Sequence, residues 1–253
     1  MMMQCSKAAL VTGAARRVGR ALALRLAAEG FGVGLHTSAR SRADAEEVAA
    51  MIRANGGGAT VVEADLADAA AVARIIPDAV GVLGPLSLLV NSASLFGEDA
   101  AQTMTPAVFD AHMAVNLRAP CLLAQAFAAQ IPEGGGSVVN IIDQRVWRLN
   151  PLYFSYTLSK AALWAATQTL AQSLAPHIRV NAIGPGPVLA NASQDAAAFA
   201  REVARLPLQR SAPLQALADA MMYLAHAQAV TGQMIAVDGG QHLAWETPDV
   251  TGG

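Results

Sequence analysis

The stretch VTGAARRVGR, from Val11 to Arg20, decides how this sequence folds. It follows a short apolar run and opens an Ala- and Leu-rich segment, which indicates a turn between a strand and a helix. The N-terminus of such a helix offers free N–H groups to a phosphate, and the turn normally carries three glycines. Here Gly13 and Gly19 are present, but Arg17 stands where the middle glycine is expected. The sequence therefore predicts a cofactor turn that accepts a long cation.

Apolar, β-rich runs alternate with helical patterns along the rest of the chain. The predicted strands are 8–12, 32–36, 59–64, 86–91, 137–142, 178–183 and 233–237. The predicted helices are 17–29, 43–54, 68–80, 106–130, 156–174 and 215–226. The strands are apolar throughout, which is typical of a parallel sheet buried on both faces and joined by right-handed crossovers. We therefore predict one α/β domain over 1–253, a doubly wound, seven-stranded parallel sheet with helices on both faces.

The segment 187–213 interrupts this alternation of strands and helices. It is flanked by prolines and follows a strand end, where open parallel sheets bind their ligands. We predict that it forms a flap over the substrate.

Composition excludes several classes of partner. The 253 residues carry a net charge of −2 with no basic stripe, which argues against nucleic acid. No charge-free apolar run of about 18 residues predicts a membrane span, and the N-terminus lacks the apolar core of a signal peptide. The two cysteines, Cys5 and Cys121, and five scattered histidines show no metal-ligand spacing. We expect a cytoplasmic protein without a metal.

The end of the second predicted strand indicates which cofactor is bound. The run FGVGLHTSARSR, from Phe31 to Arg42, contains no acid but has Arg40 and Ser41. A carboxylate there would bind the ribose 2′-OH of NAD, whereas guanidinium and hydroxyl groups hold a 2′-phosphate. The sequence therefore predicts NADPH/NADP+, although the same arginines also suit a solvated helix start.

Two further motifs follow predicted strands, VNSASLF (90–96) and NIIDQRVWRLNPLYFSYTLSK (140–160). In the second, Tyr156 and Lys160 stand four residues apart and share one face of a helix. We expect the Lys160 ammonium to lower the pKa of the Tyr156 phenol and make it a usable acid at neutral pH.

Together these motifs resemble the short-chain dehydrogenase/reductase family. The resemblance runs through VTGAARRVG, VNSAS, VNLRAP, YTLSK, RVNAIGPGPV and AVDGG, nearly the whole chain, and implies a Rossmann-type fold. It implies that Tyr156 donates a proton, that Lys160 holds the nicotinamide ribose and tunes Tyr156, and that Asn116 supports the helix with a relay water. The expected cofactor-binding residues are Gly13, Arg16, Arg17, Val18, Gly19, His36, Arg40, Ser41, Asp65, Leu66, Asn91, Ser92, Ala93, Lys160, Pro185 and Gly186.

The chain departs from the common family pattern at Arg17 and at Asp143, which stands where the family usually has a serine. Both departures resemble one branch, the pteridine reductases and the bacterial dihydromonapterin reductases. An ionised Asp143 cannot donate to a ketone oxyanion, but it can orient Tyr156 or a water that protonates the nitrogen of a C=N bond. The resemblance implies that Arg17 reaches both the cofactor phosphate and the pterin. The expected substrate-binding residues are Arg17, Ser94, Phe96, Asp143 and Tyr156.

The sequence leaves several alternatives open. An NADPH-dependent carbonyl or 3-oxoacyl reductase that tolerates Asp143 is the second reading, and a non-catalytic NADP(H)-binding regulator is the third. Phe96 either stacks on the pterin or belongs to the core, and Trp147 either caps the pocket or packs at a subunit contact. The resemblance implies a homotetramer in which the helices 106–130 and 156–174 pair across subunits. The tail 242–253 either frays or lies over a neighbour's active site; we predict the second, because Leu243 and Trp245 are costly to leave in water.

Overall fold

A single parallel sheet organises the chain in the computed structural model, which describes residues 7–190 and 195–245. The strand order is β3-β2-β1-β4-β5-β6-β7, and every neighbouring pair is parallel. The strands are β1 (Ala8–Val11), β2 (Gly32–Thr37), β3 (Ala59–Glu63), β4 (Leu88–Asn91), β5 (Gly136–Ile141), β6 (Ile178–Pro185) and β7 (Met234–Val237). This confirms the predicted seven-stranded sheet to within a few residues at each end.

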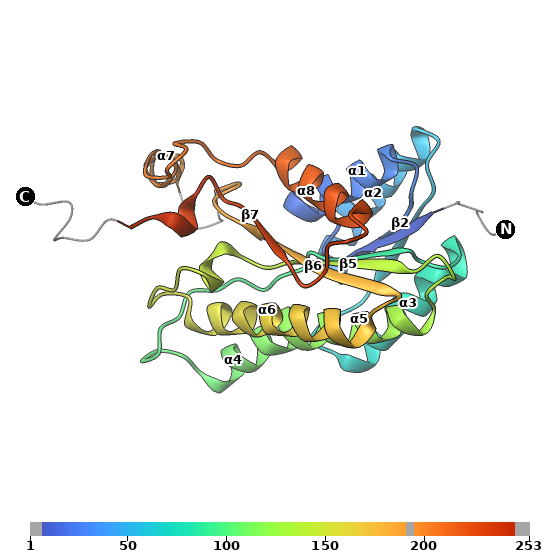
Figure 1. Cartoon of the computed structure of the whole chain (residues 1–253), viewed down its shortest axis with the longest axis horizontal. Coiled ribbons are helices and arrows are strands. Elements are labelled where there is room, and N and C mark those ends of the chain that lie inside the picture. Colours follow the sequence, from blue (N-terminus) through green and yellow to red (C-terminus); the bar gives the residue numbers. More distant parts are fainter. Residues whose placement is uncertain (1–6, 191–194, 246–253) are drawn as a thin grey trace, which may run out of the picture.

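Helices connect the strands and cover both faces of the sheet (Figure 1). They are α1 (Arg17–Ala28), α2 (Arg42–Ala54), α3 (Ala69–Leu83), α4 (Pro106–Met113), α5 (Ala119–Ala129), α6 (Phe154–Leu174), α7 (Ala196–Ala204) and α8 (Leu214–His226). Short 3-10 turns lie at η1 (Ala39–Ser41), η3 (Gln144–Val146) and η4 (Gln241–Leu243). The helix predicted over 106–130 is interrupted by a π-helical turn, η2 (Ala114–Arg118), and α7 was not predicted.

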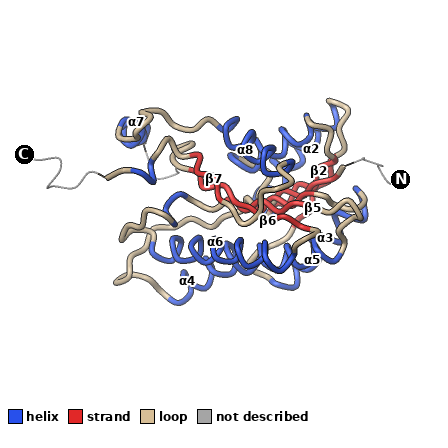
Figure 2. The backbone as a smooth tube through the Cα atoms, in the orientation of Figure 1, coloured by secondary structure: helices blue, strands red, loops and turns tan. Residues whose placement is uncertain are grey.

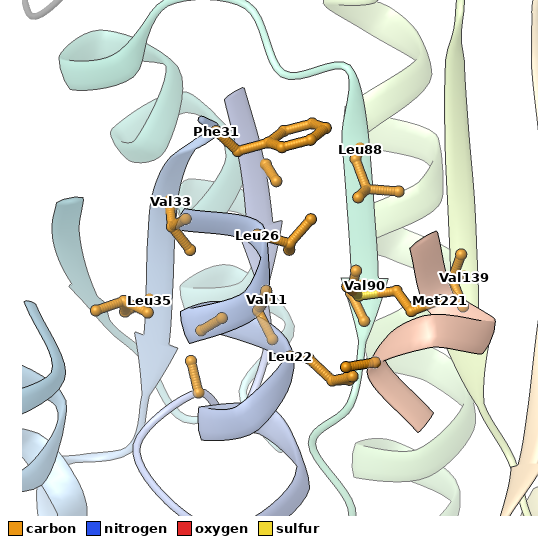
Figure 3. Packing of buried hydrophobic residues seen from close by; sticks show 14 of the residues in the cluster. Val11, Leu22, Leu26, Phe31, Val33, Leu35, Leu88, Val90, Val139 and Met221 are labelled. Carbon is orange, nitrogen blue, oxygen red and sulfur yellow. The ribbon is translucent and has the colours of Figure 1, made fainter. Parts of the chain in front are cut away.

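Two hydrophobic cores lie on opposite faces of the sheet, as the layers in Figure 2 show. Alternate residues of β1 supply them: Ala9 and Val11 join the core under α1, α2 and α8, whereas Ala8 and Leu10 join the core above α3, α5 and α6. In Figure 3, Leu22 and Leu26 of α1 pack toward the central strands. Burial on both faces explains why the strands are apolar throughout.

Within the described residues, no helix is long and apolar enough to cross a membrane. The same residues contain no group of three or more His, Cys, Asp or Glu side chains placed to hold a metal ion.

Candidate active site

The carboxyl ends of β1, β2, β3 and β4 border a cavity of about 710 Å³. This is the edge at which open parallel sheets bind ligands. Of the residues predicted to bind the cofactor, twelve line this cavity: Gly13, Arg16, Arg17, Val18, Gly19, His36, Arg40, Ser41, Asp65, Leu66, Ser92 and Ala93. Ser94, a predicted substrate residue, lines it too. Asn91 does not line it: its side chain is buried and its amide donates to Asn140.

The turn after β1 packs tightly against the first turn of α1. Gly13 has φ +65°, and a Cβ at Gly19 would stand only 2.1 Å from the Gly13 carbonyl oxygen. The turn therefore brings the backbone amides at the start of α1 close to the cavity, as a pyrophosphate requires. These residues fit a dinucleotide cofactor.

His36 braces this turn. Its imidazole is 2% exposed, accepts a hydrogen bond from the Gly13 N–H at Nδ1 (3.3 Å) and lies 3.2 Å from the Ala64 carbonyl at Nε2. These partners require a neutral ring that donates from Nε2. Burial lowers the pKa of His36 to about 4, with the Ala64 contact opposing part of the shift. The predicted cofactor residue His36 thus ties the glycine turn to β2 and β3.

Arg17 occupies the middle position of the turn with φ +49°, a left-handed conformation that glycine adopts more easily. Its guanidinium donates to the carbonyls of Ala190 (2.9 Å) and Leu189 (3.2 Å). Leu189 also lines the neighbouring cavity that contains Asp143. Arg17 therefore connects the cofactor cavity to the segment predicted as the flap.

The basic groups near the end of β2 are not equivalent. Arg42 forms ion pairs with Glu63 and Glu46 at 3.1 and 3.6 Å and does not line the cavity. Arg16 lines it but pairs with Asp44 at 2.5 Å. Arg40 lines it as well, and no ion pair joins Arg40 to a described residue. We propose that, of these three arginines, Arg40 is the one that meets a 2′-phosphate.

Asp143 and Tyr156 form one hydrogen-bonded pair, with the Tyr156 hydroxyl donating to Asp143 Oδ2 at 2.8 Å. Asp143 follows β5, and Tyr156 lies in the first turn of α6, so two elements meet at this bond. The other oxygen, Oδ1, accepts from the Arg145 N–H at 2.8 Å. Asp143 and Tyr156, which are 13 residues apart in the sequence, are therefore in direct contact.

Burial dominates the protonation of this pair. It raises the pKa of Asp143, an effect that the Arg145 amide, Tyr156 and nearby positive charge partly oppose. Burial also raises the pKa of Tyr156 well above its usual value. The charge of Asp143 and the hydrogen bond to Asp143 raise this pKa further. The expectation that Lys160 lowers the Tyr156 pKa is therefore wrong for this structure. The phenol is held protonated.

Lys160 and Asn116 support Tyr156 from α6 and from the π turn. Lys160 is 2% exposed, donates to the Ile141 carbonyl at 2.9 Å and lies 5.8 Å from the centre of the Tyr156 ring; burial lowers its pKa to about 8. Asn116 donates to Ser159 Oγ at 3.0 Å and to the Leu95 carbonyl at 2.9 Å. Lys160 thus lies beside Tyr156, and the π turn places Asn116 between the α6 helix and the loop after β4.

Aromatic side chains border the pair. Phe96 stacks on Tyr153 with ring centres 4.6 Å apart and meets Tyr156 edge-on at 4.8 Å, yet 43% of Phe96 stays exposed. The Arg145 guanidinium lies 4.7 Å from the Tyr153 ring. Phe96 is therefore not plain core. Pro185 and Gly186, the remaining predicted residues, line a cavity of about 180 Å³ with Asp143 and Tyr153.

Three site residues were missed from the sequence. Gln144 lines the same cavity, is 5% exposed, and has an Oε1 atom without a hydrogen-bond partner among the described residues. Tyr153 lies at the N-cap of α6 with φ +58°. Asp99 accepts hydrogen bonds from the Ser155 N–H (3.0 Å) and hydroxyl (2.5 Å), fixing the start of α6. No spacing signal marks them, although Gln144 adjoins Asp143.

Two sequence comparisons place this geometry among known proteins. A family model described as enoyl-(acyl carrier protein) reductase matches residues 13–242. A short-chain type dehydrogenase/reductase of Picea abies is 34% identical, covering 93% of this chain and 92% of its own. The 3-oxoacyl-[acyl-carrier-protein] reductase FabG of Staphylococcus aureus is 31% identical, covering 95% and 100%.

A comparison of structures finds a nearer likeness. The crystal structure of FolM alternative dihydrofolate reductase 1 from Brucella canis, complexed with NADP, is 51% identical to this chain with a TM-score of 0.94. Each chain covers 98% of the other. With the fold, the glycine turn and the Tyr156–Lys160 pair, these matches lead to one conclusion: the chain belongs to the short-chain dehydrogenase/reductase family.

Proposed function

We propose that the protein uses NADPH to reduce a C=N bond in a pterin or folate-type substrate, as in the pteridine reductase branch of its family. The observation that carries this proposal is the Asp143–Tyr156 hydrogen bond of 2.8 Å. Asp143 stands where the family usually has a serine, whose hydroxyl donates to a developing oxyanion, whereas an ionised carboxylate can only accept hydrogen bonds.

A C=N bond asks for different groups than a ketone does. When bound, NADPH supplies the hydride that adds to the ring carbon. The adjacent nitrogen would then take the Tyr156 hydroxyl proton, which Asp143 Oδ2 accepts in the resting site; the hydroxyl turns from Asp143 to the nitrogen as the nitrogen becomes basic. The raised pKa of each member keeps a proton within the pair until the nitrogen becomes basic, and water restores that proton afterwards.

The surroundings of the pair suit a flat heterocycle. Phe96 and Tyr153 offer aromatic surface, and the unpaired Oε1 of Gln144 offers an acceptor to an exocyclic amine. Arg17 stands between the cofactor cavity and Leu189, which agrees with a cation that serves both ligands. The likeness to a FolM alternative dihydrofolate reductase complexed with NADP supports the substrate class and the cofactor.

A carbonyl or 3-oxoacyl reductase is the second candidate, because several relatives are named 3-oxoacyl-[acyl-carrier-protein] reductase. Asp143 argues against it, since a carboxylate repels the oxyanion that a ketone forms. The intact set of Asn116, Tyr156 and Lys160 argues against a non-catalytic regulator.

A screen of NADPH oxidation separates these functions. We expect turnover with dihydromonapterin, dihydrobiopterin or dihydrofolate and weak turnover with ketones and 3-oxoacyl thioesters. Good reduction of ketones with none of pterins would establish the second candidate instead. NADH in place of NADPH serves as the cofactor control.

A further inference from the structure

A cavity of about 480 Å³ adjoins the candidate active site, and no step of the proposed reaction uses it. Three arginines line it: Arg201 and Arg205 from α7 and its C-cap, and Arg148 from the segment after β5. Figure 1 shows α7 near the last described turn, apart from the helices that cover the sheet. The volume of the cavity lies within the usual range of small-molecule sites.

The arginines converge without a matching set of carboxylates. Arg201 and Arg205 stand four residues apart on one helical face, where like charges disfavour the helix slightly. No ion pair joins Arg148, Arg201 or Arg205 to any described residue. Among the described residues, Arg148 donates only to the Ala244 carbonyl, at 3.2 Å. Glu202 is the acid in the lining, and its Oε1 accepts from Gln241 at 3.3 Å. Positive charge therefore dominates the cavity.

This cavity adjoins the one around Asp143. Glu202 and Gln241 line both, so the two cavities share a wall. A ligand whose reacting ring lies against Asp143 and Tyr153 would direct a substituent past Gln241 toward the arginines. Guanidinium groups hold carboxylates and phosphates through charge-assisted, often bidentate hydrogen bonds.

We infer that the arginine-lined cavity is a subsite for an anionic substituent of the substrate, either the carboxylates of a folate-type tail or a phosphate on a pterin side chain. This inference rests on the proposed function, because that function places the heterocycle against Asp143. It assigns α7 a binding role: the helix would hold the charged end of the substrate while β5 and α6 hold the reacting end.

The test compares substrates with and without the anionic group. In the double variant R201Q/R205Q, KM for dihydrofolate should rise about tenfold or more, as expected for lost charge-assisted contacts, while kcat stays unchanged. KM for dihydrobiopterin, whose side chain is uncharged, should not move. A dihydropterin with a phosphorylated side chain forms the third arm, and the anionic substrate that responds more strongly identifies the source of the anion.

Two further variants control for charge and folding. R201K/R205K should keep most of the affinity, and Arg74→Gln, an exposed arginine on α3, should change no KM. Equal KM changes for all three substrates, or none, would overturn the subsite while the proposed function stands.

Binding without turnover separates the subsite from the function. If the wild type reduces no pterin, the proposed function fails. Calorimetry with p-aminobenzoyl-glutamate on the NADP-loaded protein then tests the cavity alone. Binding that R201Q/R205Q loses and Arg74→Gln retains supports the anion site, and no binding overturns it.

Discussion

Asp143 and Tyr156 act as a unit at the scale of single residues. Tyr156 is buried and Asp143 is partly buried, one hydrogen bond joins them, and desolvation raises the pKa of both. The pKa values at which the two groups lose their protons therefore belong to the pair and not to either residue alone. This arrangement makes Asp143 the residue on which the substrate class depends.

Replacing Asp143 by Ser restores the usual family hydroxyl and exchanges an acceptor for a donor. We predict that Asp143→Ser lowers dihydropterin turnover roughly 100-fold or more, in line with loss of a positioned proton-transfer partner. The Kd for NADPH should barely change, because Asp143 lies outside the larger cavity. Asp143→Asn, which keeps an acceptor oxygen but does not titrate, separates alignment from proton supply. Full pterin activity in Asp143→Ser would make Asp143 a bystander.

His36 makes stability depend on pH. The fold binds the neutral ring and lowers its pKa to about 4, whereas the unfolded chain takes up a proton near pH 6.5. The contribution is complete above pH 6.5 and is lost as pH falls toward 4. We predict a loss of about 2–3 kcal/mol between pH 7 and 4.5 through this group. Urea unfolding should show a steeper pH dependence in the wild type than in His36→Gln; equal slopes would contradict the prediction.

At the scale of residues, the sequence predicted which side chains lie in the candidate site better than it predicted how buried they are. Tyr156, Lys160 and Asp143 were found by spacing and by departure from a motif, and the structure brings them together. The direction of the Tyr156 pKa was wrong, because burial outweighs a nearby lysine and sequence does not report burial. Gln144 carried no signal for the same reason.

Arg17 joins two segments that are far apart in sequence, the start of α1 and the segment at Leu189 and Ala190. Arg17→Gly should relieve the left-handed backbone and remove both hydrogen bonds. We predict unchanged or higher thermal stability, since the strain is worth about 1 kcal/mol, together with a higher KM for both substrates. Arg17→Lys keeps the charge but not the fork, and should show an intermediate KM. A large loss of stability in Arg17→Gly would contradict this account.

Asp99 fixes the start of α6, the helix that carries Tyr156 and Lys160. Asp99→Ala should lower the free energy of unfolding by about 1–2 kcal/mol, as loss of a cap does, and kcat about tenfold through misplacement of Tyr156. Asp68→Ala is the matched control, because Asp68 caps α3 through the Ala70 N–H. It should lose similar stability at unchanged kcat. Equal kcat losses in both would assign the effect to folding alone.

Helices and strands with a clear hydrophobic pattern were predicted to within a few residues, whereas two elements were not predicted. The π turn at 114–118 has an ordinary helical sequence, and it forms where Asn116 bonds to Leu95 and Ser159. The helix α7 lies inside the segment predicted as a flap, and its Ala-rich pattern was not recognised. The predicted flap role of 187–213 stays a prediction.

For the whole molecule we propose a homotetramer in which α4–α5 and α6 pair across subunits. Leu158 and Ala165 on α6 are exposed in the single chain, which suits close packing of a second helix. Ala165→Arg should reduce the mass measured by light scattering, whereas Ala43→Arg, on α2 at the opposite face, should not. A wild-type monomer at micromolar concentration would contradict the proposal.

The end of the chain was predicted to lie over a neighbouring site. Residues 246–253 of that tail lie outside the described residues, and its first apolar members, Leu243 and Trp245, are 63% and 67% exposed. Trp147 is also exposed and contacts Trp164 and His242. The structure thus gathers exposed aromatic surface beside the last turn.

The glycine turn has a consequence for how such enzymes diversify. At position 19 glycine is demanded by space, since any Cβ would collide with the Gly13 carbonyl. At position 17 the backbone has a left-handed conformation that glycine adopts more easily, and Arg17 adopts it as well. One position is closed to mutation, while the other is open for the modest strain of a single residue. Natural selection can therefore explore new chemistry at position 17 without dismantling the cofactor site.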